Sequence, residues 1–98
     1  MSFSHRIRNY YEQMVAEEIL RQFEKLGRDK DGGVMADIAC VALNRLPPRY
    51  IRYEVDMAFY MSPDELVSMK NNIVQTVSAA IDFVGQHTRE DDSDDDIV

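Results

Sequence analysis

Two consecutive prolines, Pro47 and Pro48, interrupt a helical pattern and so determine where the chain must turn. Proline has no backbone N–H group and disfavours helical geometry in the residue before it, so the preceding helix is expected to end near Arg45. The chain should then leave this corner in an extended run. Four polar or aromatic side chains flank the corner and are expected to cluster in space: Asn44, Arg45, Arg49 and Tyr50.

Apolar residues at steps of three and four predict a mainly helical fold with two long helices and one short one. The first long helix is expected over about residues 4–26, with Gly27 as its stop. A short helix over residues 34–45 leads into the proline corner. Between these helices lies a polar linker, residues 28–33, whose paired glycines we interpret as a hinge.

The second long helix has a distinct start signal. Ser62 suits the N-cap, Pro63 the first helical position, and Glu65 the third position of a capping box. The apolar pattern continues from there to about Gln86, which gives a second long helix.

Residues 51–59 alternate between apolar and polar side chains, which predicts one half-buried strand. The sequence offers no evident second strand, and a lone strand leaves its backbone donors and acceptors unpaired. We therefore expect antiparallel pairing with the same strand of a second protomer, and hence a homodimer. The alternative is irregular structure packed on the helices.

The 98 residues suffice for one domain with a small core, which we assign to residues 1–88. The net charge of −7 is uneven, because residues 1–52 carry nine Lys and Arg against seven Asp and Glu, whereas residues 53–98 carry two against eleven. Six of these acids lie in residues 89–98, which we expect to form an acidic disordered tail. The acidic total argues against binding to duplex nucleic acid.

The sequence also argues against several functional classes. The single cysteine, Cys40, excludes an intrachain disulfide and a zinc site built from paired cysteines. His5 and His87 have no spaced partner for a metal. No apolar run reaches membrane-spanning length and residues 1–8 hold no signal-peptide core, so we expect a cytoplasmic protein without membrane insertion. No catalytic motif stands out, and we expect a non-enzyme.

The order of residues 37–50 resembles the signature of the ComFB-type late competence development family, and the segment from Asn9 to Val15 resembles that family's opening pattern. The similarity covers about residues 9–52. The resemblance implies a small, mainly helical dimer. It also implies a regulatory protein that binds a cyclic dinucleotide, with cyclic di-GMP as the first candidate, needs no cofactor, and signals through a protein partner. The alternative is a ligand-free dimeric adaptor for competence, pilus or motility machinery.

Many members of this family hold a structural zinc with a cysteine cluster in the linker between the first two helices. Residues 27–33 of this chain read Gly-Arg-Asp-Lys-Asp-Gly-Gly instead. The chain therefore resembles a zinc-free member of the family.

A cyclic dinucleotide presents two phosphates and two purines, so its receptor needs guanidiniums, planar stacking groups, and amides or carboxylates that bind base edges. Arg45 and Arg49 could bind phosphate or stack on a base, and Tyr50 could stack. Asn44 or Asp37 could bind a guanine edge. Further positive charge could come from Arg8, and after it from Arg6 and Arg52.

Each of these residues also has a structural interpretation. Arg45 and Arg49 near a helix C-terminus favour its dipole, Tyr50 could belong to the core, and Asn44 could cap exposed carbonyls. For Asn9 we favour a hydrogen bond that holds the first helix against the proline corner over contact with a ligand.

Overall fold

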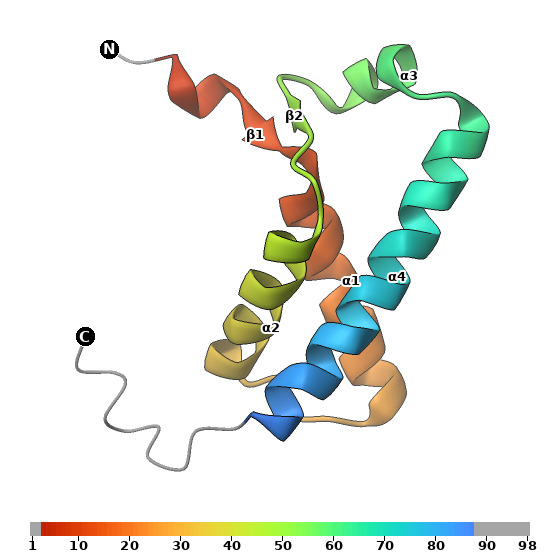
Figure 1. Ribbon diagram of the computed structural model, residues 1–98. Helices are drawn as coiled ribbons and strands as arrows, with labels where there is room; N and C mark the ends of the chain where they lie inside the picture. Colours follow the sequence, from red (N-terminus) through yellow and green to blue (C-terminus); the bar gives the residue numbers. More distant parts are fainter. Residues whose placement is uncertain (1–2, 88–98) are drawn as a thin grey trace.

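Three helices packed around one apolar core form the body of the computed structural model, which describes residues 3–87 (Figure 1). They are α1 (Tyr10–Leu26), α2 (Gly32–Arg45) and α4 (Pro63–Gln86). Each of the three contacts the other two. The shorter elements are η1 (Ser4–Arg6), β1 (Arg8–Asn9), β2 (Tyr50–Ile51), η2 (Glu54–Asp56) and α3 (Met57–Tyr60). The predicted mainly helical fold, with two long helices and one short helix before the prolines, is confirmed.

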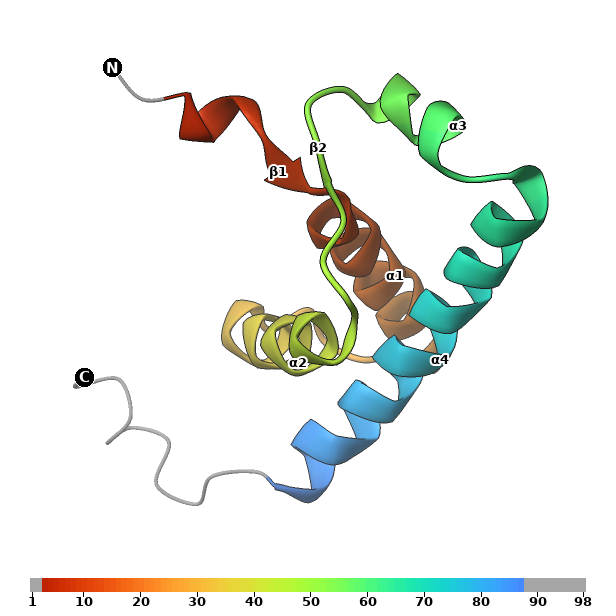
Figure 2. The ribbon, with the colours of Figure 1, turned by 45° about the horizontal axis from the view of Figure 1, so that its top comes forward.

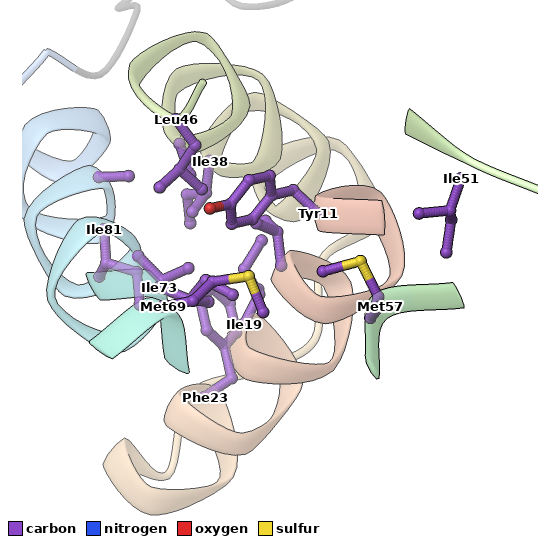
Figure 3. Packing of buried hydrophobic residues seen from close by; sticks show 14 residues of the cluster. Tyr11, Ile19, Phe23, Ile38, Leu46, Ile51, Met57, Met69, Ile73 and Ile81 are labelled. Atoms are coloured by element: carbon purple, nitrogen blue, oxygen red, sulfur yellow. The ribbon is translucent and has the colours of Figure 1, made fainter. Parts of the chain in front are cut away.

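The core is built from side chains that recur at helical spacing on each helix. Phe23 of α1, Ile38 of α2 and Val77 of α4 are completely buried. Figure 3 shows the side chains of the three helices pointing toward one another, with Met57 and Ile51 at one edge of the cluster. Burying a side chain of this size contributes about 1.5 to 3 kcal/mol, so this cluster is the main source of stability.

Helix α1 begins at Tyr10, not near Ser4 as the periodicity predicted. Asn9 is its N-cap: the backbone of Asn9 is extended and its side-chain oxygen accepts a hydrogen bond from the Tyr11 N–H at 3.3 Å. The helix ends as predicted at Gly27, whose φ of 67° lies in the left-handed region. There the Arg28 N–H donates to the Phe23 carbonyl at 3.0 Å, which closes the last turn.

Helix α2 begins two residues earlier than predicted. Asp31 caps it, accepting hydrogen bonds from the Gly33 N–H at 2.9 Å and the Val34 N–H at 3.1 Å. Gly32 and Gly33 therefore form the first turn of the helix, and their interpretation as a hinge was wrong. The helix ends at Arg45 and the backbone of the next residue is extended, as the prolines predicted.

The strand predicted over residues 51–59 is much shorter, and its partner lies within the same chain. β2 pairs antiparallel with β1, with Arg8 opposite Ile51 and Asn9 opposite Tyr50. Beyond β2 the Asp56 carboxylate accepts a hydrogen bond from the Tyr53 N–H at 3.2 Å, and the chain turns into η2 and α3. The expectation of a lone, unpaired strand was thus wrong. Strand pairing between two protomers is therefore no longer an argument for the homodimer, which stays a prediction.

Helix α4 has the predicted start. The Ser62 hydroxyl accepts a hydrogen bond from the Glu65 N–H at 3.2 Å, and the Glu65 carboxylate accepts one from the Ser62 N–H at 2.8 Å. The helix runs to Gln86, also as predicted. The predicted acidic tail, residues 89–98, lies outside the described residues.

Candidate functional site

The proline corner is attached to the start of α1 through Asn9. Its side-chain oxygen accepts a hydrogen bond from the Arg49 N–H at 2.9 Å, in addition to the capping bond from Tyr11. The Tyr10 N–H donates to the Arg49 carbonyl at 2.6 Å. Residues about 40 positions apart are thereby joined at one point, and the expected structural role of Asn9 is confirmed.

The two arginines of the corner point toward opposite ends of α4. The guanidinium carbon of Arg45 lies 5.1 Å from the centroid of the Phe83 ring, near the C-terminus of the helix. Hydrogen bonds with Ser62 are the main reason why the pKa of Glu65, in the first turn, is lowered, and the nearby charge of Arg49 lowers it further. Eighteen residues of helix separate Glu65 from Phe83, which is about 27 Å. The structure therefore does not bring Arg45 and Arg49 into one cluster.

The remaining predicted residues are dispersed as well. The Asn44 amide donates to the Cys40 carbonyl of its own helix at 2.8 Å, as a structural role would require. Asp37 is half-buried two turns earlier on α2. Tyr50 is exposed on β2, so it does not belong to the core. Arg8 lies on β1, exposed, and pairs with Glu54 at 3.5 Å.

Arg8 also lines a hollow of about 410 Å³ where the N-terminal segment meets the chain beyond β2. We call it the cationic hollow. Its lining residues come from η1, β1 and the segment after β2: His5, Arg6, Ile7, Arg8, Arg52 and Tyr53. The pairing of β1 with β2 brings these distant segments together (Figure 2).

The chemistry of the cationic hollow suits an anion that also carries a flat ring, such as a nucleotide. Three guanidiniums supply positive charge and paired N–H donors, and the guanidinium carbon of Arg52 lies 5.1 Å from the centroid of the Tyr53 ring. The side chains of Arg8 and Glu54 are each more than half exposed, so their ion pair contributes little to the stability of the fold. A phosphate could therefore replace the Glu54 carboxylate as the partner of Arg8. The volume lies within the roughly 300 to 1,000 Å³ typical of small-molecule sites.

Sequence analysis named Arg6, Arg8 and Arg52 as sources of charge but missed His5 and Tyr53 as neighbours of these arginines. The signal that could have identified them is the antiparallel register of β1 and β2, which places residues 5–8 beside residues 52–53. A two-residue strand carries too little pattern to reveal that register.

A second hollow, of about 460 Å³, lies between the starts of α1 and α4. Asp64 and Glu65 line it. Hydrogen bonds with Ser62 hold the pKa of Glu65 below its ordinary value, so this carboxylate stays charged and opposes an anion there. The cationic hollow is therefore the better candidate for a phosphate-bearing ligand.

The linker between α1 and α2, where the resemblance suggested that relatives place a zinc site, holds charged side chains with other partners in this chain. The Lys30 ammonium lies 3.1 Å from the Glu24 carboxylate, the Arg28 guanidinium covers the Phe23 ring, and Asp31 caps α2. These groups do not fit a thiolate zinc site. Within residues 3–87, His, Cys, Asp and Glu side chains form no cluster of three or more that could hold a metal ion.

None of the helices in the described part of the chain combines the length and apolar content needed to cross a membrane.

In comparisons with known proteins, a family model described as late competence development protein ComFB matches residues 8–88. A search of curated proteins finds no match to the chain. The family match extends beyond the corner to α4.

Proposed function

The chain belongs to the family of the late competence development protein ComFB, and on that premise we propose that it binds a cyclic dinucleotide, with cyclic di-GMP as the first candidate, in the cationic hollow. We assign it the role of a cytoplasmic regulatory protein, not an enzyme, that passes the state of the ligand to a protein partner.

The convergence of Arg6, Arg8 and Arg52 beside Tyr53 carries this proposal. The arginines match the phosphates of the ligand, because guanidinium groups bind phosphate through paired, charge-assisted hydrogen bonds. The phenol ring and the guanidinium planes match its purines, which stack on flat side chains. Asp64 and Glu65 make the second hollow less suitable for such a ligand.

The signature residues then act mainly through the backbone. Arg49 and Asn9 attach the proline corner to α1, and β2 carries the chain from the corner to Arg52. In this interpretation the corner positions the cationic hollow. Of the candidate ligand-binding residues Arg45, Arg49, Asn44, Tyr50, Asp37 and Arg8, Arg8 lines it.

One observation favours the alternative of a ligand-free adaptor for competence, pilus or motility machinery. Arg45 stacks on Phe83, and Phe83 stacks on His87 with 4.2 Å between ring centroids, so a prominent arginine of the signature serves the packing of α2 on α4. If the arginines of the signature serve only the packing of the fold, their presence is explained without a bound nucleotide.

Calorimetric titration with cyclic di-GMP, and then cyclic di-AMP, separates these two functions. We expect saturable binding that is weakened about tenfold or more by Arg52→Ala and by Arg8→Ala, because a hydrogen bond to a charged group contributes about 1.5 to 3 kcal/mol. The ligand at one hundred times its Kd should also stabilise the fold by about 2.7 kcal/mol.

Arg28→Ala is the matched control, since it removes the same charge at the opposite end of α1 and should leave the affinity unchanged. Loss of binding in Arg45→Ala and Arg49→Ala, with none in Arg52→Ala, would move the site to the proline corner. The absence of heat and of a melting shift with either nucleotide would refute the receptor function and favour the adaptor.

A further inference from the structure

A negatively charged side chain, Glu54, lies at the edge of the cationic hollow. It follows Tyr53 as the first residue of η2, and its carboxylate lies 3.5 Å from the Arg8 guanidinium. Both Arg8 and Tyr53 line the hollow. Burial raises the pKa of the Tyr10 phenol and the charge of Glu54 raises it further, so the carboxylate is also close to Tyr10. A ligand that fills the hollow therefore meets Glu54.

Glu54 is better placed for this contact than Asp56, the next carboxylate along the chain. An Asp56 oxygen accepts a hydrogen bond from the Tyr53 N–H at 3.2 Å, which holds the turn at η2. The Glu54 side chain is more than half exposed, and its ion pair with Arg8 contributes little to the stability of the fold. The Glu54 carboxylate can therefore exchange one partner for another without disturbing the chain around it.

Binding of a phosphate would leave the Glu54 carboxylate without its partner. The phosphate takes the Arg8 guanidinium, and the rest of the ligand then covers the carboxylate that Arg8 has left. A carboxylate only accepts hydrogen bonds, and covering its charge without donors is costly. A ligand that binds well must therefore bring N–H donors of its own.

The two purines of the candidate ligands differ in the donors that they offer to a carboxylate. The Watson–Crick edge of guanine has two neighbouring N–H donors, at N1 and at the exocyclic amino group, which match the two oxygens of a carboxylate. Adenine has an unprotonated N1 at the same place, and its lone pair would face the negative charge. A site that hydrogen-bonds one ligand discriminates against an analogue that lacks the matching group. A carboxylate in this position therefore favours guanine.

We propose that Glu54 determines the purine specificity of the cationic hollow, by accepting hydrogen bonds from guanine that adenine cannot donate. The proposal rests on the proposed function, because it concerns a nucleotide bound in the same hollow. It gives Glu54 the contact with a guanine edge that the sequence suggested for Asn44 or Asp37. Asn44 instead donates to the Cys40 carbonyl, and neither Asn44 nor Asp37 lines the hollow.

Calorimetric titration of wild type and Glu54→Gln with cyclic di-GMP and with cyclic di-AMP tests the proposal. The wild type should bind cyclic di-GMP about tenfold or more tightly than cyclic di-AMP. Glutamine has the same size as glutamate but replaces one accepting oxygen by an N–H₂ donor. The variant should therefore bind cyclic di-GMP more weakly and cyclic di-AMP at least as tightly as before, so that the ratio of the two Kd values falls about tenfold or more.

Glu24→Gln is the matched control, because it makes the same chemical change in an exposed ion pair, with Lys30, at the opposite end of α1. It should leave the ratio of the two Kd values unchanged. A wild type that binds both nucleotides equally or prefers cyclic di-AMP, or a ratio that Glu54→Gln does not change, would overturn this proposal and leave the proposed function standing. A wild type that binds neither nucleotide would refute the proposed function, and this proposal with it.

Discussion

At the scale of single residues, Asn9 illustrates how one side chain can serve two parts of the fold. Its oxygen accepts from the N–H groups of Tyr11 and Arg49, so it caps α1 and holds the proline corner at once. Sequence analysis anticipated that Asn9 holds the corner by a hydrogen bond, but it placed Asn9 within the first helix and not at its start. The capping register that starts α1 at Tyr10 was missed, because the apolar spacing extends further upstream.

Asn9→Ala should lower the free energy of unfolding by about 1 to 3 kcal/mol, because it removes a cap and leaves the Arg49 N–H without its acceptor. Urea denaturation of the two proteins measures the difference. Asn9→Asp retains the accepting oxygen and should remain close to wild type. Equal loss in both variants would show that the amide N–H₂ group, and not the oxygen, is what matters.

Gln22 is a buried polar residue within the packed face of α1. Its amide donates to the Val74 carbonyl of α4 at 3.1 Å and to the Glu18 carboxylate at 2.7 Å. Gln22→Ala should therefore cost about 1 to 3 kcal/mol of unfolding free energy, by loss of these bonds and of packing.

Gln13→Ala provides the comparison for Gln22→Ala. Gln13 makes a hydrogen bond only on the exposed face, to Glu17, so its replacement should change the free energy of unfolding by no more than about 0.5 kcal/mol. Thermal or urea unfolding gives both values. Similar effects at the two positions would show that the bond to Val74 adds nothing to the packing of α1 on α4.

At the scale of secondary-structure elements, the ends of the helices were the most predictable features. Three helix ends were predicted correctly: the end of α1 at Gly27, the end of α2 at Arg45 and the start of α4 at Ser62. Each of them depends on residues a few positions away, so the sequence alone is enough to predict it. The strand over residues 51–59 was predicted wrongly, because alternation also fits a 3₁₀ turn followed by a short helix that is anchored in the core by Met57.

The start of α4 gives a prediction with a defined dependence on pH. Hydrogen bonds with Ser62 lower the pKa of Glu65 below its ordinary value of 4.5, so the folded protein favours the charged carboxylate. This contribution to stability is complete above that value and is lost as the pH falls through the lowered pKa. The melting temperature of Glu65→Gln should therefore lie below that of wild type at neutral pH and approach it in acid.

Ser62→Ala removes the other half of the same capping box and should cost about 1 kcal/mol. Because Ser62 does not titrate, most of that loss should persist in acid. A difference between Glu65→Gln and wild type that stays constant from neutral to acidic pH would contradict the role assigned to the Glu65 charge.

At the scale of the whole molecule, the family and the helical architecture could be predicted from the chain, but the shape of the candidate site could not. Arg6, Arg8 and Arg52 were recognised as charges, yet their meeting point depends on a pairing between segments about 40 residues apart. The stronger candidates, Arg45 and Arg49, are adjacent in sequence but are directed to opposite ends of α4. Proximity in sequence was a poor guide because the helix ends at Arg45 and the three residues between the arginines, Leu46 to Pro48, carry the chain away from it.

The cationic hollow is lined from both sides of the pairing between β1 and β2. A ligand that contacts both sides would stabilise the paired state, and a variant that weakens the pairing would lower the affinity for the ligand. Under the proposed function, the N-terminal segment would then exchange its amide hydrogens more slowly when the messenger is abundant, so that the rigidity of this segment would follow the messenger concentration.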